Sequence, residues 1–319
     1  MLSTFRSLPA EAIPKELWQA EVLSLPRTLA DAYTNRVTDL GLSATADDCR
    51  ALGSGEIGGI SEEESDRHFC GRFPNSAART QFALLDPASA LGDLPDKLLQ
   101  AFLMGKIAVI DLPSGSGAGV WGVLSAIATL RRERVIPRPP IQIQIFGGDI
   151  STYANTHNIG LSDAVRQSFA ELDMHIELRC SLWDATDSRS TAMLMDLVAP
   201  FLQDVDITLV CISNFSGEMQ NDEFRQKVET NLTQVVSRVA GQPHAVIWVE
   251  SASKTAKKFL PKVILFFQRH LPWLSLGDSA DVSQAFYSVC DPWNGATFQT
   301  GLSVVKFEPG ALAWKGLRG

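Results

Sequence analysis

Residues 107–119 read Ile107-Ala108-Val109-Ile110-Asp111-Leu112-Pro113-Ser114-Gly115-Ser116-Gly117-Ala118-Gly119. A short apolar run ends in an acid, and a turn rich in glycine and serine leads toward apolar residues at helical spacing. Such a run is typical of a strand buried on both faces of a sheet. Glycines let the backbone approach a ligand closely, and α/β folds bind ligands at the carboxyl ends of their strands. The segment therefore predicts a strand, a ligand-binding loop and a helix.

The same alternation of strand and helix continues toward the C-terminus. We expect further strands at 141–146, 176–183, 207–212 and 245–249, with Ser162 and Ser190 as caps of intervening helices. This order predicts a doubly wound, mostly parallel sheet with right-handed crossovers. The stretches 285–289 and 302–307, on either side of a turn at Asn294-Gly295, add an antiparallel hairpin. The fold class is therefore α/β.

Residues 1–100 lack this alternation and are predicted to form a helical extension that shapes substrate access or subunit contacts. The core is expected over 101–319. We predict a mobile acidic connection over 42–67, which contains Glu62, Glu63 and Glu64. Pro74 is expected to end any element before it, because proline disfavours helical backbone in the preceding residue. An amphipathic helix is expected over 96–104.

Composition excludes several classes of protein. The formal charge of −8 argues against binding of extended duplex nucleic acid, for which basic side chains must neutralise phosphates. The 5 cysteines are scattered without a CxxC pair, so we expect reduced thiols and no metal site. No apolar run approaches the roughly 20 residues of a membrane span, and the first residues lack a signal-peptide pattern. The sequence thus predicts a cytoplasmic protein without a membrane partner.

Two interpretations of the glycine-rich loop compete. Residues 117–122 match the letters GxGxxG of dinucleotide-binding folds, which would make the chain an NAD(P)-dependent oxidoreductase. In those folds the first glycine follows the strand directly. Here the match begins well after Asp111, where the helix should already have started.

The second interpretation compares the strand ends with one another. Asp111, Gly115 and Gly117 fall in register with an acid-x-Gly-x-Gly-x-Gly motif, with Pro113 in place of its first glycine. The later strands end in Asp149-Ile150-Ser151, Trp183-Asp184-Ala185, Ser213-Asn214-Phe215 and Val249-Glu250-Ser251. In this order the segments resemble the motifs of class I S-adenosylmethionine-dependent methyltransferases. The resemblance covers 101–319 and implies a seven-stranded, Rossmann-like fold.

The resemblance also implies a cofactor and its contacts. The cofactor would be S-adenosylmethionine, with S-adenosylhomocysteine as product. The carboxylate of Asp149 would accept hydrogen bonds from the ribose hydroxyls, and Asp184 with Ala185 would meet the adenine. The implied cofactor-binding residues are Asp111, Pro113, Ser114, Gly115, Ser116, Gly117, Asp149, Ile150, Asp184, Ala185 and Ser213. Asn214 and Phe215 are the candidates on the acceptor side, and no general base is evident.

Each candidate also has an ordinary structural explanation. Asp111 and Asp149 could cap helices, and Asp187 could exchange roles with Asp184. Asn214-Phe215 lacks the Pro-Pro of amino-group methyltransferases. Cys211 lies inside an apolar strand, so we interpret it as a buried thiol rather than a nucleophile.

The functional hypothesis is a methyltransferase whose acceptor is a small molecule, a protein or an RNA. The first alternative, motivated by Pro113 and the missing base, is a non-catalytic subunit or sensor with this fold. The second alternative is the oxidoreductase. A homo- or hetero-oligomer is compatible with all three hypotheses. His68 and Arg72 lie ahead of the core, where such proteins often close over substrate, although direct contact with the substrate is the weaker interpretation.

Overall fold

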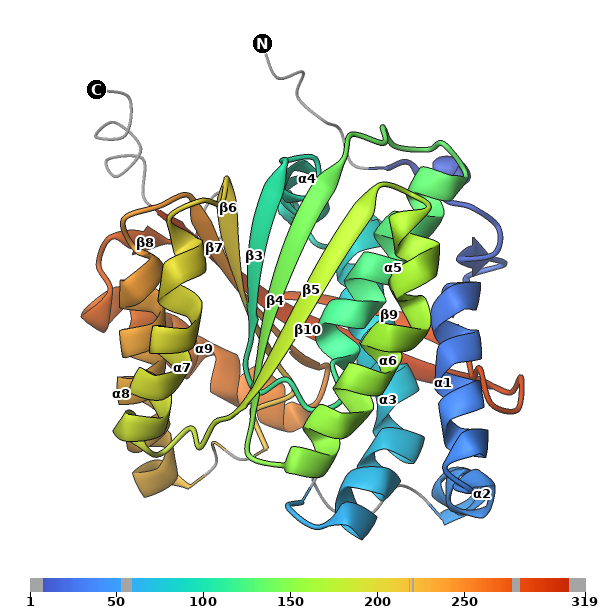
Figure 1. Cartoon of the computed structure of the whole chain (residues 1–319), viewed down its shortest axis with the longest axis horizontal. Coiled ribbons are helices and arrows are strands. Elements are labelled where there is room, and N and C mark those ends of the chain that lie inside the picture. Colours follow the sequence, from blue (N-terminus) through green and yellow to red (C-terminus); the bar gives the residue numbers. More distant parts are fainter. Residues whose placement is uncertain (1–7, 53–58, 218, 220, 277–281, 310–319) are drawn as a thin grey trace.

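The computed structural model describes residues 8–52, 59–217, 219, 221–276 and 282–309. In this part of the chain, helices surround one central sheet (Figure 1). The strands are β1 (Trp18–Gln19), β2 (Val22–Ser24), β3 (Lys106–Asp111), β4 (Ile141–Asp149), β5 (Met174–Leu182), β6 (Ile207–Ser213), β7 (His244–Ser251), β8 (Leu274–Ser275), β9 (Ser283–Cys290) and β10 (Thr297–Pro309). The helices are a short 3₁₀ turn (Ala10–Ala12), α1 (Arg27–Asp39), α2 (Ser43–Leu52), α3 (Glu62–Leu85), α4 (Leu94–Ala101), α5 (Ala118–Arg132), α6 (Thr152–Ala170), α7 (Ser188–Leu202), α8 (Asp222–Val239) and α9 (Lys254–His270).

The strand order confirms the predicted fold class. Across the sheet it runs β5-β4-β3-β6-β7-β10-β9-β2-β1, and β8 pairs with β10. The strands from β5 to β7 are parallel, in the order of a Rossmann-like half-sheet. After β7 the sheet continues with the hairpin β9–β10, in which β10 is antiparallel to both of its long neighbours. This is a Rossmann-like arrangement with the expected antiparallel C-terminal hairpin.

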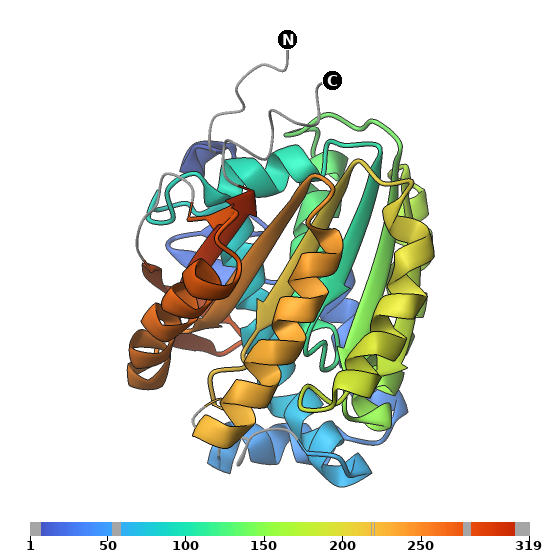
Figure 2. The same cartoon turned by 90° about the vertical axis from the view of Figure 1, so that its left-hand side faces the viewer.

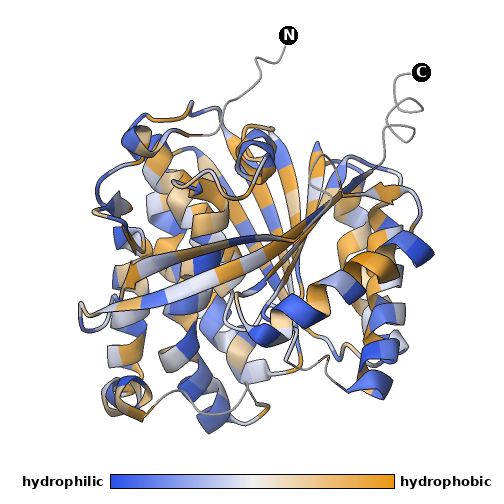
Figure 3. Cartoon of the chain, turned by 180° about the vertical axis from the view of Figure 1, so that it is seen from behind, coloured by the Kyte–Doolittle hydropathy of each residue, from blue (hydrophilic) through white to orange (hydrophobic). Residues whose placement is uncertain are grey.

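The sheet separates two hydrophobic cores. Ile107 and Val109 of β3 face α1, α3, α5 and α6, whereas Ala108 and Ile110 face α7, α8 and α9. The turned view in Figure 2 shows α7, α8 and α9 in front of the sheet. Because both faces are covered, the strands can be apolar throughout. Hydrophobic and hydrophilic residues are interspersed along the helices (Figure 3). No helix in the described part of the chain is long and apolar enough to cross a membrane.

The N-terminal extension contains two strands as well as helices. The hairpin β1–β2 continues the sheet beyond β9, and Val22 to Ser24 of β2 pair in parallel with Ser288 to Cys290. Side chains of the extension share one hydrophobic core with β3, α5 and β4. The boundary near residue 100 stays a prediction.

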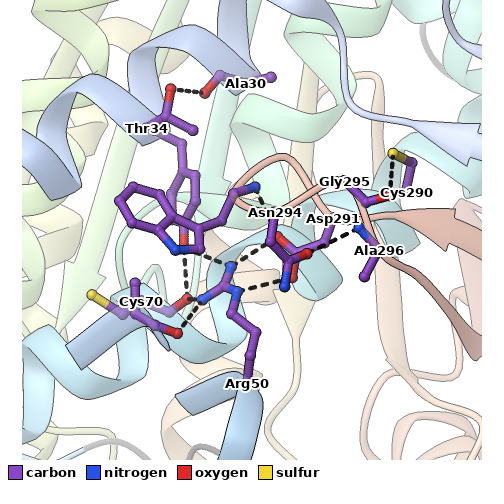
Figure 4. Close-up of polar contacts among 12 residues, drawn as sticks. Ala30, Thr34, Arg50, Cys70, Cys290, Asp291, Asn294, Gly295 and Ala296 are labelled. Atoms are coloured by element: carbon purple, nitrogen blue, oxygen red, sulfur yellow. Dashed lines mark hydrogen bonds and ion pairs between the residues drawn. The ribbon is translucent and has the colours of Figure 1, made fainter. Parts of the chain in front are cut away.

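Pro74 does not end a helix, which corrects the expectation from sequence. It lies in the middle of α3, where it lacks the N–H that would bond to the carbonyl of Cys70. That carbonyl accepts hydrogen bonds from Tyr33 Oη at 2.6 Å and Arg50 Nη1 at 2.7 Å. Figure 4 shows Arg50 between Cys70 and Asp291. Tertiary donors therefore replace the missing backbone bond, so the helix continues.

The expected mobile connection over 42–67 is also wrong where the structure describes it. Ser43–Leu52 form α2, and Ser61 begins α3 with a capping box to Glu64. Glu62, Glu63 and Glu64 occupy the first turn of α3, where acidic side chains interact favourably with the helix dipole. Residues 53–58 lie outside the described part of the chain.

Two helix starts differ from the predicted ones. Ser151 caps α6, so that helix begins well before Ser162. Asp187 caps α7 through a bond from Arg189 N to its Oδ1, while the hydroxyl of Ser190 accepts from Asp184 N at 2.9 Å. Both helices therefore begin closer to the preceding strand than predicted, and the loops at the carboxyl edge of the sheet are shorter.

Candidate functional site

The largest group of predicted residues meets in one cavity at the carboxyl ends of β3, β4, β5 and β6. The chain passes from β3 to β4 on one side and returns to β6 on the other, which is where α/β sheets open a crevice. The cavity has a volume of about 370 Å³. The predicted residues that line it are Pro113, Ser114, Gly115, Ser116, Asp149, Ile150, Asp184, Ala185, Ser213, Asn214 and Phe215.

Asp111 and Gly117 were predicted to contact the cofactor but are not among the residues that line the cavity. Asp111 is 1% exposed, and neither carboxylate oxygen has a hydrogen-bond partner in the described part of the chain. Burial, and secondarily Asp149, raises the pKa of Asp111 well above its ordinary value. Gly117 precedes α5 with φ of +79°, and a Cβ there would lie 2.2 Å from Asn158 Oδ1. Gly117 thus shapes the turn that carries the lining residues.

Asp149 holds the glycine-rich loop in place. Its Oδ2 accepts from Gly115 N at 2.8 Å and its Oδ1 from Ser151 N at 2.9 Å. Burial raises the pKa of Asp149, and these backbone bonds act in the opposite direction. A carboxylate oxygen can accept more than one hydrogen bond, so Asp149 keeps capacity for a ligand. Gly115 has φ of +50°, and a Cβ built on it would meet no atom within 4 Å, so the loop leaves open space above it.

The structure distinguishes Asp184 from Asp187. Asp184 lines the cavity, and its Oδ1 accepts from Thr186 N and from Thr186 Oγ1. Asp187 is the N-cap of α7 and is not a lining residue. Beside them the buried indole of Trp183 donates to Thr191 Oγ1 at 3.0 Å, which fixes the wall of the cavity after β5.

The loop after β6 is held by buried charged groups. Asn214 has φ of +55°, and its N–H donates to Val249 O at 2.9 Å. Its Oδ1 accepts from Nη1 of Arg79, which comes from α3 and is 7% exposed. Glu250 accepts from Phe215 N at 2.7 Å and from Ser216 N at 2.8 Å. Burial raises the pKa of Glu250, which its hydrogen bonds partly offset.

Helix α3 covers the cavity, and sequence reasoning missed most of its contribution. Ser65, His68, Phe73 and Ser76 all line the cavity, and only His68 had been singled out. The hydroxyls of Ser65 and Ser151 lie 2.7 Å apart and join α3 to the start of α6. Burial, with Arg72 nearby, lowers the pKa of His68 to about 4, so its imidazole is neutral near pH 7. The signal was polar residues at helical spacing, hidden by the assumption that Pro74 breaks the helix.

Other chemistries find little support at this site. Burial raises the pKa of the Cys211 thiol, and Cys211 does not line the cavity. Across the described ranges, no cluster of three or more His, Cys, Asp or Glu side chains could hold a metal ion. Gly119 and Gly122 of the GxGxxG letters lie within α5. A Cβ on Gly122 would be 2.3 Å from the Ala77 carbonyl oxygen, so this glycine allows α3 to pack against α5.

Comparison with known proteins finds similarity only among solved structures. No family model matches the chain, and neither does any curated protein. One similar structure concerns "Conversion of a Disulfide Bond into a Thioacetal Group during Echinomycin Biosynthesis"; it has 12% identity and a TM-score of 0.36, and the match covers 69% of this chain and 84% of that one. Another is the glycopeptide N-methyltransferase MtfA in complex with S-adenosyl-L-methionine, with 8% identity, a TM-score of 0.29 and coverage of 67% and 86%. Values this low carry no argument about residue roles, so the fold assignment rests on the strand order.

Proposed function

We propose that this protein binds S-adenosylmethionine in the cavity and transfers its methyl group to an acceptor, with S-adenosylhomocysteine as product. The observation that supports this most is the convergence of four separate segments. Residues picked from the ends of β3, β4, β5 and β6 because of their sequence pattern line a single cavity. Parallel strands bring their carboxyl ends to one edge in any such sheet, so the support comes from what these loops carry: a glycine-rich turn and two carboxylates that line the same cavity.

The lining groups fit a sulfonium nucleoside by their chemistry. Asp149 retains acceptor capacity for the two ribose hydroxyls, and the second carboxylate oxygen of Asp184 is available to an exocyclic amine. The open space at Gly115 lets a ligand approach the backbone of the loop. Ile150 is 49% exposed and offers an apolar contact to a flat base.

The protein's part in such a reaction is to align two molecules. When bound, S-adenosylmethionine supplies a methyl group on a positively charged sulfur. The loop after β6, fixed by Glu250 and Arg79, would hold the acceptor in line with that methyl group. Helix α3 would exclude water from the reacting groups, because it covers the same cavity. A protein that binds the cofactor without transferring the methyl group is the alternative, and turnover separates the two.

Calorimetric titration tests the cofactor assignment. We expect S-adenosylmethionine and S-adenosylhomocysteine to bind and NAD(P)H not to bind. Asp184→Asn should weaken S-adenosylhomocysteine binding about tenfold or more, because one charge-assisted hydrogen bond contributes about 1.5 to 3 kcal/mol. Asp187→Asn is the matched control; it changes a neighbouring acid outside the cavity and should leave the affinity within about twofold. NADPH binding without S-adenosylhomocysteine binding, or equal effects of both variants, would contradict the proposal.

Methyl transfer is tested by incubating the protein and labelled S-adenosylmethionine with a cell extract. Label in a product fraction supports catalysis. Cofactor binding without label in any fraction would favour the non-catalytic alternative.

A further inference from the structure

The amide of Asn214 can face the cavity in only one orientation. A guanidinium group has donors and no acceptor, so the group that Arg79 Nη1 contacts must be the amide oxygen of Asn214. Among the described residues, no hydrogen bond is donated by the amide nitrogen of Asn214. The residue lines the cavity and is half-buried. The cavity therefore meets a hydrogen-bond donor at this position.

The donor is held rigidly from behind. The backbone of Asn214 is fixed by its bond to Val249 O, and the next two residues are fixed by the carboxylate of Glu250. Arg79 is 7% exposed on α3, whose packing on α5 leaves no room even for a methyl group at Gly122. A donor that needs no reorganisation selects strongly for an acceptor atom opposite it.

The surroundings of Asn214 favour a flat acid over an amine. Phe73, Phe215 and Phe224 supply aromatic surface to the cavity, and Ser76 supplies a hydroxyl. Within the described residues, the carboxylates that line the cavity are Asp149 and Asp184, at the ends of β4 and β5. The cavity wall beside Asn214 thus exposes no carboxylate to pair with an ammonium ion. Behind it, the buried Arg79 cation contacts Asn214 Oδ1, while the buried Glu250 carboxylate accepts from the N–H groups of Phe215 and Ser216.

We propose that the methyl acceptor is a small aromatic acid bound as its oxygen anion, a carboxylate or phenolate, which Asn214 positions through its amide N–H. This rests on the proposed function. The oxygen lone pair forms the new C–O bond while the C–S bond breaks, and the bonding electrons go to sulfur. A carboxylic acid has already lost its proton in neutral solution, and an acidic phenol such as 4-nitrophenol has lost it in large part, so no general base is required for these acceptors. A neutral ester or ether and a neutral thioether result from one anion and one sulfonium cation.

The test uses the full chain saturated with S-adenosylhomocysteine and three probes of similar ring size: benzoate, 4-nitrophenol and benzylamine. We expect both acids to bind at least about tenfold more tightly than benzylamine. The absorption spectrum of 4-nitrophenol distinguishes phenol from phenolate, and the bound form should be the phenolate. Tighter binding of benzylamine, no binding of either acid at millimolar concentration, or binding of the neutral phenol would each overturn the inference.

Two variants that add the same negative charge test whether Asn214 is responsible for the binding of benzoate. Asn214→Asp keeps the partner of Arg79 but replaces the donor with an acceptor, and should weaken benzoate binding at least about tenfold. Asn221→Asp adds the same charge at the N-cap of α8, outside the cavity, and should leave benzoate affinity within about twofold. S-adenosylhomocysteine affinity should stay within about twofold in both.

Equal losses of benzoate affinity in the two variants would overturn the role of Asn214. A selective loss of S-adenosylhomocysteine affinity in Asn214→Asp would do the same, because it would assign the amide to the cofactor. These results differ from failure of the proposed function, in which the unmodified chain would not bind S-adenosylhomocysteine at all.

Discussion

Replacing Arg50 with methionine is expected to destabilise the folded protein by about 3 to 5 kcal/mol, the usual cost of breaking a buried ion pair. Arg50 contacts both carboxylate oxygens of Asp291 at 2.9 Å, and the two side chains are 16% and 10% exposed. It also donates to the carbonyl of Cys70 at 2.7 Å and to Tyr33 Oη at 3.1 Å. The substitution therefore leaves an uncompensated carboxylate and weakens the accommodation of Pro74 in α3.

Pro74→Ala separates these two contributions. Alanine restores the backbone N–H that can bond to the Cys70 carbonyl. That carbonyl then no longer depends only on the hydrogen bonds from Arg50 and Tyr33. In the Pro74→Ala background, Arg50→Met should cost about 0.5 to 1.5 kcal/mol less, the net value of one hydrogen bond. A double-mutant cycle measures this difference directly.

The assay is urea denaturation followed by fluorescence and circular dichroism. The midpoint should fall in Arg50→Met with an unchanged slope, because the surface exposed on unfolding is the same. Arg27→Met is the control: Arg27 pairs with Asp31 on the surface, with side chains 84% and 64% exposed, and should cost less than about 0.5 kcal/mol. A cost below about 1 kcal/mol for Arg50→Met would refute the estimate. The same cost in both Pro74 backgrounds would refute the role of Arg50 at the proline.

Three further predictions concern the support of the cavity. Gly122→Ala should destabilise the protein by about 1 to 3 kcal/mol in urea denaturation, because a Cβ would clash with the Ala77 carbonyl. Gly241→Ala is the control and should not destabilise it, because no atom lies near the added Cβ. Equal midpoints for the two variants would contradict the contact between α3 and α5. Asp111→Asn should stabilise the protein by about 1 to 3 kcal/mol at pH 8, because an unpaired buried carboxylate is costly. The folded-state pKa of Asp111 is raised, so the wild-type protein loses stability as the pH rises above the ordinary range of Asp. The stability gained in Asp111→Asn should therefore vanish near pH 3, where the wild-type carboxyl is protonated in both states. A gain that does not change with pH would be inconsistent with this origin. In the native protein the Cys211 thiol should resist alkylation at pH 8, measured by mass spectrometry of labelled peptides, because burial raises its pKa; rapid labelling before unfolding would contradict the buried assignment.

The core of the fold could be predicted because its strands are long, apolar and separated by helical stripes. The apolar run at β3 is a local pattern, and so is the helical spacing of the apolar residues Val228, Leu232, Val235, Val236 and Val239; the structure has a strand at the first and helix α8 at the second. The hairpin β1–β2 could not be predicted. Its strands are two and three residues long and pair with a neighbour from the other end of the chain, so no local period marks them.

The extent of helix α3 was not predicted, for a related reason. Proline predicts a helix end from local chemistry, but Tyr33 and Arg50 satisfy the exposed carbonyl from elements that are distant in sequence. The candidate site divides in the same way. Strand-end residues such as Asp149 and Asp184 follow from the strand pattern, whereas Arg79 and Ser65 reach the site only through the path of α3.

The most direct test of the central claim is a crystal structure of the protein with S-adenosylhomocysteine. We predict the adenine beside Asp184 and Ala185, the ribose hydroxyls within hydrogen-bond distance of Asp149, and the sulfur directed toward the loop at Ser213 and Asn214. A nucleoside bound outside this cavity, or bound within it without contact to either carboxylate, would contradict the account.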